Sequence, residues 1–236
     1  MISYFSKILL ASIQFFVLFS AWSDACEIEL VIAMDVSRSV DQYEFDLMRH
    51  GTANAFSHPE IIERIAWMEK GMMVAVTQWS GAEKQKVSVP WRHVKTQKSL
   101  KQLSDDIRTM KRAFRFEFTA PAEALTHAFS LFEKNPRPCR RRVIDLSGDG
   151  LANQGGETGI TADLIARNGV TINGLVIRGN NPDPLSFYIE EVKRGAVSFV
   201  EIANGYDDFS RAMFRKILRE VSDLYSANNP YVTSKY

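Results

Sequence analysis

The sequence predicts an α/β fold, namely a doubly wound, mostly parallel six-stranded sheet with one antiparallel edge strand and helices on both faces. Short apolar runs alternate along the chain with longer stretches whose apolar residues recur every three or four positions. This alternation is typical of a parallel sheet covered by helices. The first run, residues 30–34, is continuously apolar, which favours a strand that is buried on both faces.

The first half of the chain contains three expected strands and three expected helices. Residues 85–91 alternate Val87 and Val89 with polar residues after a turn at Gly81, so we expect an antiparallel strand at the sheet edge. Thr119 suits the N-cap of the third helix, with Pro121 in its first turn. The expected strands are 27–35, 72–80 and 85–91, and the expected helices are 40–56, 99–114 and 119–132.

The second half of the chain repeats one pattern, in which a strand is followed by a helix. No linker or low-complexity tract divides it from the first half. We therefore expect one domain over residues 26–226, followed by a polar tail at 227–236. The expected strands are 142–150, which ends in a Gly-rich turn, 170–177 and 196–202, and the expected helices are 157–167, 184–194 and 209–225.

Residues 1–25 have the features of a secretory signal peptide. Lys7 precedes an apolar core at 8–19, and the small residues Ser23 and Ala25 follow it. The core is shorter than the roughly 20 residues of a membrane span, although an uncleaved anchor is the competing interpretation. We expect an exported protein, periplasmic or extracellular, without a stable membrane span after cleavage.

Composition and motifs argue against several functional classes. The formal net charge is +1, so no global bias favours nucleic acid or an anionic membrane. The glycines around Asp149 lack the Lys of a phosphate-binding loop, and no GxSxG surrounds Ser147. The four histidines lack the spacing of a zinc site.

The two cysteines precede two of the expected buried strands by similar distances. Cys26 lies nine positions before Asp35, and Cys139 lies ten positions before Asp149. If these strands are parallel neighbours, both cysteines fall at the end of the sheet opposite the two aspartates. A Cys26–Cys139 disulfide is then geometrically reasonable in an oxidising compartment. The alternative is two free thiols.

Oxygen-bearing side chains follow the expected strands at their carboxyl ends. Asp35, Ser37 and Ser39 follow the first strand, Asp149 follows a later one, and Thr119 starts a helix. In a doubly wound sheet all five converge where the strand order reverses. Carboxylates and hydroxyls are ligands for Mg²⁺. The simpler alternative is that Asp35 only caps the next helix.

These residues resemble the metal-ion-dependent adhesion site of von Willebrand factor type A domains. The resemblance covers roughly residues 27–224, and the segments 33–41 (AMDVSRSVD) and 144–150 (IDLSGDG) are similar to those of a bacterial exported subfamily of unassigned function. It implies that Ser37 and Ser39 bind the metal directly. It also implies that Thr119, Asp35 and Asp149 bind it directly or through water, and that a partner's carboxylate often supplies the last ligand.

This sequence departs from the family at two places. Glu117 and Phe118 precede Thr119, where the family usually has glycine. Ser147 and Gly148 stand before Asp149, so Asp145 is an alternative ligand, although a structural role suits a carboxylate inside an apolar strand better.

The expected function is an exported, non-enzymatic, adhesion-type module. It binds Mg²⁺ or Mn²⁺ at Asp35, Ser37, Ser39, Thr119 and Asp149, and through the metal it binds a protein or other acidic ligand. One alternative is a metal-dependent hydrolase that uses Asp35 or Asp149 with bound water. Another is a structural module without ligand binding.

Overall fold

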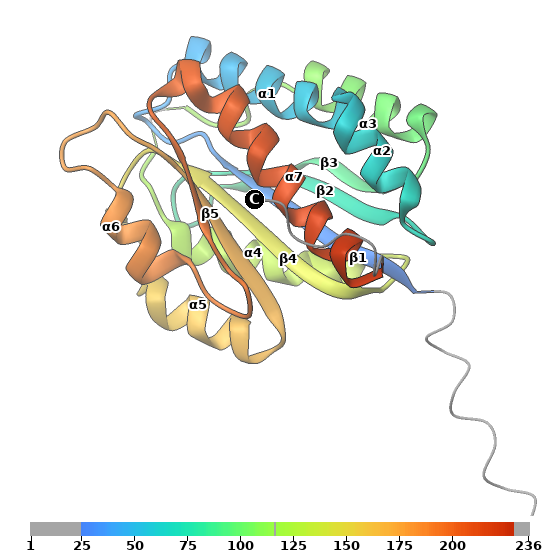
Figure 1. Ribbon diagram of the computed structural model, residues 1–236. Helices are drawn as coiled ribbons and strands as arrows, with labels where there is room; N and C mark the ends of the chain where they lie inside the picture. The colour runs from blue at the N-terminus through green and yellow to red at the C-terminus, as the bar shows by residue number, and fades with distance from the viewer. Residues whose placement is uncertain (1–24, 116, 229–236) are drawn as a thin grey trace, which may run out of the picture.

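The computed structural model describes residues 25–115 and 117–228, and side chains as far as residue 222. A central sheet lies between two layers of helices (Figure 1). Residues 1–24 of the expected signal peptide and residues 229–236 of the expected tail lie outside the described residues. Within the described part, no helix has the length and apolar character needed to span a membrane.

The sheet has six strands in the order β3-β2-β1-β4-β5-β6. Neighbouring strands are parallel except β3, which pairs antiparallel with β2 at one edge. The predicted fold class is therefore confirmed. The strands are β1 (Cys26–Asp35), β2 (Met72–Trp79), β3 (Gln85–Val94), β4 (Cys139–Gly148), β5 (Val170–Ile177) and β6 (Val200–Ala203).

The helices divide between the two faces of the sheet (Figure 1). One layer consists of α1 (Gln42–Ser57), α2 (Pro59–Trp67), α3 (Gln97–Thr109) and α7 (Phe209–Asn228). The other consists of α4 (Pro121–Leu131), α5 (Thr158–Arg167) and the short α6 (Leu185–Phe187). The short turns are η1 (Phe132–Lys134), η2 (Tyr188–Val192) and η3 (Tyr206–Asp208).

Strand β1 divides the core into two parts because its side chains alternate between the faces. Leu30 and Ile32 pack with α1, α2, α3 and α7, whereas Val31 and Ala33 pack with α4, α5 and η2. All four are fully buried. Burying one large aliphatic side chain stabilises the fold by about 1.5 to 3 kcal/mol, so this strand anchors both layers.

Two predicted helices were wrong in extent. The helix expected at 99–114 ends at Thr109, because the buried Gln78 amide donates to the Lys111 carbonyl (2.9 Å) and accepts from the Ala113 N–H (2.8 Å). These bonds replace the helical ones. The helix expected at 184–194 is only α6 followed by the π-type turn η2.

The last predicted strand also begins later than expected, at Val200 instead of residue 196. Val197 has φ of +51°, a conformation outside the β region. Before this turn, Arg194 forms an isolated antiparallel bridge with Ile172 of β5. The regular parallel pairing with β5 begins after the turn, at Val200, and the Phe199 N–H donates to the Asn173 side chain at 2.8 Å.

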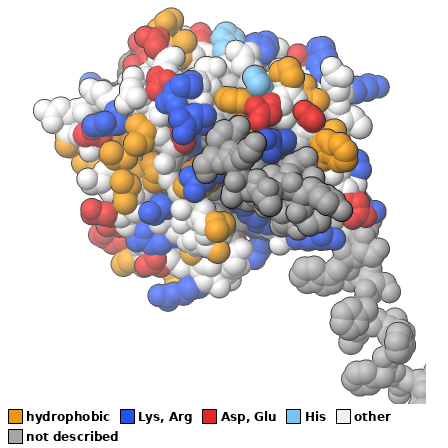
Figure 2. All heavy atoms as spheres, in the orientation of Figure 1, with side chains coloured by type: hydrophobic (Ala, Val, Ile, Leu, Met, Phe, Trp, Pro, Cys, Tyr) orange, Lys and Arg blue, Asp and Glu red, His pale blue; other side chains and the backbone are white. Residues whose placement is uncertain are grey.

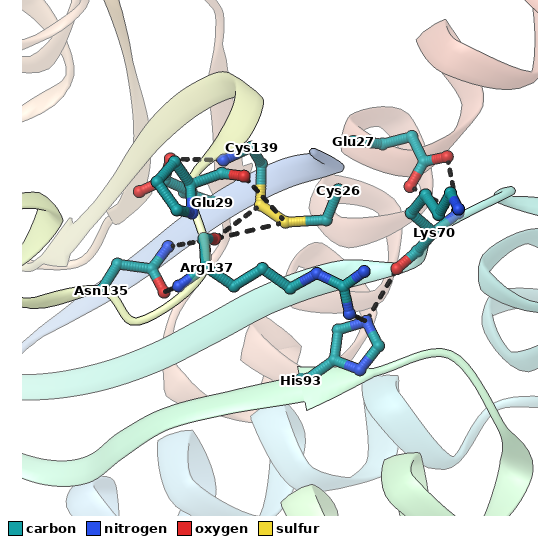
Figure 3. Close-up of a disulfide and its surroundings, with 9 residues drawn as sticks. Cys26, Glu27, Glu29, Lys70, His93, Asn135, Arg137 and Cys139 are labelled. Atoms are coloured by element: carbon teal, nitrogen blue, oxygen red, sulfur yellow. Dashed lines mark hydrogen bonds between the residues drawn. A yellow bond between two sulfur atoms is a disulfide. The ribbon is translucent and has the colours of Figure 1, made fainter. Parts of the chain in front are cut away.

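A disulfide joins the first residues of β1 and β4, as predicted (Figure 3). Cys26 and Cys139 are register partners in the two parallel strands. The Cys139 N–H donates to the buried Glu29 carboxylate at 2.8 Å, so polar contacts also close this end of the sheet. Asp35 lies at the other end of β1.

A buried charged cluster ties α7 to the sheet. Lys216 forms an ion pair with Asp145 of β4 and lies 3.7 Å from Glu220 one turn along α7. Arg141 pairs with Glu220 at 2.9 Å, and the Asn173 amide donates to the same carboxylate. Asp145 thus contributes to packing between β4 and α7, which is the structural role that the sequence favoured.

The molecular surface mixes charges of both signs. Figure 2 shows acidic and basic side chains interspersed over the face turned toward the viewer, with hydrophobic side chains gathered toward the side where Figure 1 places α6. This agrees with the formal net charge of +1.

Candidate metal centre

The candidate site lies where the strand order of the sheet reverses. The chain moves outward from β1 to β2 and β3 on one side, and from β4 to β5 and β6 on the other. In open α/β sheets, such a reversal leaves a crevice at the carboxyl ends of the two central strands. Asp35 ends β1 and Asp149 directly follows β4, so both aspartates are delivered to this crevice.

Asp35 is held by the loop that follows it and not by a helix end. Its Oδ1 accepts from the Ser37 N–H at 2.7 Å, and its Oδ2 is buried without a hydrogen-bond partner among the described residues. The N-cap of α1 is Asp41, which forms a capping box with Glu44. The capping role considered for Asp35 is therefore wrong.

Hydroxyls connect the β1 loop to the β4 loop. The Ser39 Oγ donates to the Asp149 Oδ1 at 2.7 Å and lies 3.4 Å from the Ser37 Oγ. The other carboxylate oxygen of Asp149 accepts from the Asn180 amide at 3.0 Å. Ser37 and Asp149 are buried, whereas Ser39 is exposed. The structure thus brings Asp35, Ser37, Ser39 and Asp149 into one cluster.

Thr119 reaches the same rim from the loop before α4. Its N–H donates to the Asn153 side chain at 2.8 Å, and its carbonyl accepts from the Asn153 N–H at 3.0 Å. The Glu117 carbonyl accepts from the Arg38 N–H at 2.9 Å, which places this loop against the Ser37–Ser39 segment. The N-cap of α4 is Ala120, so the capping role predicted for Thr119 is wrong.

The two carboxylates of the cluster repel one another in a buried environment. Burial, and then the charge of Asp149, raises the pKa of Asp35 to about 7, while Arg112 and the Ser37 hydrogen bonds act in the opposite direction. Two close anions away from water are costly unless a cation or proton compensates them.

Two tyrosines border the same carboxylates. Burial and the nearby negative charges raise the pKa of Tyr188 and Tyr206, so both phenols are neutral at physiological pH. At Gly148, an added methyl carbon would lie 2.5 Å from the Tyr188 Oη and 2.7 Å from the Asp35 Oδ2. The absence of a side chain at Gly148 therefore lets Tyr188 and Asp35 approach the end of β4.

The cluster fits a hard divalent cation. Its donors are carboxylate and hydroxyl oxygens, as Mg²⁺ and Mn²⁺ prefer, and the unpaired Asp35 Oδ2 has an unmet need for a positive partner. Among the described residues, no group of three or more His, Cys, Asp or Glu is arranged so that it could hold a metal ion. The described part therefore shows no zinc site built from these residue types. In the candidate site, three of the five side chains carry hydroxyls, namely Ser37, Ser39 and Thr119.

Two supporting residues had no recognisable signal in the sequence. Arg112, on the loop after α3, donates to the carbonyls of Val36 (3.2 Å) and Ser37 (3.0 Å). Asn180, on the loop after β5, donates to both the carbonyl and the carboxylate of Asp149. Both act on atoms of distant segments, and only the folded chain brings those segments together.

Comparison with known proteins places the chain in a family. The family model described as "Protein of unknown function (DUF1194)" matches residues 25–225. The chain belongs to the DUF1194 family. This family is von Willebrand factor type A-like, which confirms the resemblance for the fold. No curated protein sequence matches this DUF1194 chain.

Solved structures with the same fold include a mussel byssus protein, a pilus adhesin and a bacterial type A domain. Proximal thread matrix protein 1, solved with a zinc-occupied MIDAS motif, is 15% identical with a TM-score of 0.60, covering 85% of this chain and 47% of its own. SpaC, the pilus adhesin of Lactobacillus rhamnosus GG, is 11% identical with a TM-score of 0.62, covering 85% and 31%. The von Willebrand factor type A protein of Catenulispora acidiphila is 14% identical with a TM-score of 0.53, covering 84% and 43%.

The DUF1194 chain spans about half the length of the mussel protein and less of the other two. At these identities the likeness establishes a shared fold.

Proposed function

We propose that the protein is an exported, non-enzymatic interaction module that binds a divalent cation, Mg²⁺ or Mn²⁺, and through it a protein or other acidic ligand. The proposed ligands are Asp35, Ser37, Ser39, Thr119 and Asp149. In this proposal, residues 1–25 are removed as a signal peptide and residues 26–226 form the binding domain.

The observation that carries the proposal is the convergence of Asp35, Ser39 and Asp149. The carboxylates of Asp35 and Asp149, at the ends of neighbouring strands, are close enough to repel one another. The Ser39 hydroxyl donates a hydrogen bond to Asp149 at 2.7 Å. A divalent cation would relieve the repulsion that raises the Asp35 pKa. If Asp35 and Asp149 bind through water, the ligands in direct contact are neutral hydroxyls, so the cation keeps a net positive charge and attracts an anionic oxygen from a partner.

The residues around the cluster would keep it ready for the cation. Arg112 holds the carbonyls of Val36 and Ser37, and Asn180 holds the outer oxygen of Asp149. Such supporting hydrogen bonds orient ligands and reduce the entropy lost on binding. The SpaC adhesin, which has the same fold, supports the interaction reading.

Export is supported by the disulfide. Cys26 and Cys139 are bonded across β1 and β4, and disulfides persist in oxidising compartments. The proposed location is therefore periplasmic or extracellular.

A metal-dependent pull-down tests the proposal. Immobilised wild type and the immobilised Ser37→Ala/Ser39→Ala variant are each exposed to an extract of the source cell envelope, once in Mg²⁺ and once in EDTA. We expect a partner that is retained by the wild type only in Mg²⁺ and is not retained by the variant. Metal-dependent cleavage of a generic phosphoester would instead favour a hydrolase, and failure of both assays would favour a structural module.

A further inference from the structure

Phe118 is a large apolar side chain that projects into solvent beside the candidate metal centre. It is 56% exposed, although it directly precedes the buried Thr119. Leu151, two residues after Asp149, is 36% exposed. Single exposed apolar residues are common on protein surfaces, so the case depends on how Phe118 is held and on what surrounds it.

Hydrogen bonds fix the backbone from Phe118 to Ala120. Its carbonyl accepts from the Ser80 Oγ at 2.9 Å, and the Ala120 N–H donates to the Ser80 carbonyl at 2.9 Å. Thr119 pairs with Asn153 through donor and acceptor bonds of 2.8 and 3.0 Å. The Phe118 ring is therefore presented from a rigid segment, which lowers the entropy lost when a partner packs on it.

The same hydrogen bonds place Leu151 on the neighbouring segment. Asn153, which pairs with Thr119, lies two residues after Leu151. The loops that carry Phe118 and Leu151 are therefore bonded side by side at the rim of the metal centre.

The loop after β1 also contacts the segment that carries Phe118, and this loop contains a positively charged residue. Arg38 is exposed, and its N–H donates to the Glu117 carbonyl at 2.9 Å. Arg38 also lies between Ser37 and Ser39, within the loop that provides two candidate ligands. The rim thus combines an apolar anchor with a cationic side chain next to a site for a divalent cation.

We propose that Phe118 determines specificity, by packing against an apolar side chain of a partner segment whose neighbouring Asp or Glu occupies the metal. This inference rests on the proposed function and deepens it. The occupant is an acidic peptide segment with an aromatic or aliphatic residue close to its carboxylate. Arg38 complements the negative charge of that segment, and Leu151 extends the apolar contact. Aromatic side chains are enriched at protein interfaces, where a few central residues carry most of the binding energy.

Selection from a random peptide library tests the proposal. Peptides displayed on phage are bound to the immobilised full chain in Mg²⁺ and eluted with EDTA. We expect the enriched peptides to contain Asp or Glu within about three positions of an aromatic or large aliphatic residue, the reach of neighbouring side chains on a short segment. An alanine at either position of a synthetic peptide should abolish its binding.

Protein variants then separate Phe118 from the metal. Phe118→Ala should weaken the enriched peptide at least tenfold, whereas Phe118→Leu should retain part of the binding. Both variants should bind Mn²⁺ as the wild type does in calorimetry, because Phe118 offers no oxygen ligand. Trp67→Ala is the matched control: Trp67 is 70% exposed and ends α2 at the disulfide end of the sheet.

The outcomes distinguish this inference from the proposed function. Peptides that elute with EDTA but bind Phe118→Ala as tightly as wild type would overturn the role of Phe118 alone. Peptides that stay bound in EDTA would overturn the metal-dependent function, and with it this inference. An absence of any enriched peptide would count against both.

Discussion

Ser39 donates a hydrogen bond of 2.7 Å to Asp149 across 110 residues of chain. The bond joins the loop after β1 to the loop after β4, the two strands between which the sheet order reverses. In the same cluster, the Asp35 Oδ2 is buried and has no hydrogen-bond partner among the described residues. This combination of a closed hydroxyl bridge and an unsatisfied carboxylate is the physical basis of the proposed cation site.

Gly148→Ala should disrupt the candidate centre and destabilise the fold. The added carbon would lie 2.5 Å from the Tyr188 Oη and 2.7 Å from the Asp35 Oδ2, and both side chains are buried. Overpacking of this kind costs about 1 to 3 kcal/mol. Urea unfolding measures the loss of stability.

Gly150→Ala is the matched control for that substitution. A carbon added at Gly150 would have no atom within 4 Å. The stability of the Gly150→Ala variant should therefore stay within about 0.5 kcal/mol of wild type. Equal destabilisation by Gly148→Ala and Gly150→Ala would contradict the steric explanation for the effect at Gly148.

Glu220 should make the stability of the protein depend on pH. Burial, and then the charge of Asp145, raises the pKa of Glu220 to about 7 from an ordinary value of 4.5, although Lys216 and Arg141 oppose the shift. Between these two values the folded state binds a proton that the unfolded state has released. The stabilising contribution is therefore complete below pH 4.5 and is lost as the pH rises through 7.

The measurement is urea unfolding of wild type and Glu220→Gln from pH 5 to 8. The wild type should lose stability relative to the variant over this range, by roughly 1 to 3 kcal/mol. Glu190→Gln, at an exposed carboxylate, should run parallel to the wild type. A constant difference between wild type and Glu220→Gln would contradict the assignment.

Loss of the Cys26–Cys139 disulfide should lower the melting temperature. The bond closes a loop with a sequence separation of 113 residues, and the chain-entropy model gives at most about 4 to 5 kcal/mol for such a loop. Cys26→Ser/Cys139→Ser and reduced wild type should melt at similar, lower temperatures. If complete reduction, verified by thiol titration, left the wild-type melting temperature unchanged, the disulfide would have no stabilising role.

The sequence predicted those parts of the molecule that depend on local pattern. Leu30–Met34 is buried on both faces because its apolar run is continuous, and β3 lies at the edge because its valines alternate with polar residues. The end of α3 could not be predicted, since the helical spacing continues to Phe114. The buried Gln78 amide captures the backbone instead.

The clustering of the candidate ligands could be predicted from the sequence, but the residues that support them could not; whether these side chains bind a metal stays a prediction. Asp35, Ser37 and Ser39 lie within five residues of chain, and this pattern predicts a strand end rich in oxygen donors. Arg112 and Asn180 carry no such pattern, because each acts on one distant segment that only the fold brings near.

Calorimetric titration of Mn²⁺ or Mg²⁺ into the purified protein tests the central claim most directly. We expect one site per chain in the wild type, with affinity reduced at least tenfold in Ser37→Ala/Ser39→Ala. Ser130→Ala, whose hydroxyl donates to the His127 carbonyl on α4, should bind as the wild type does. Binding by the double variant that equals the wild type, or no binding by the wild type, would contradict the account.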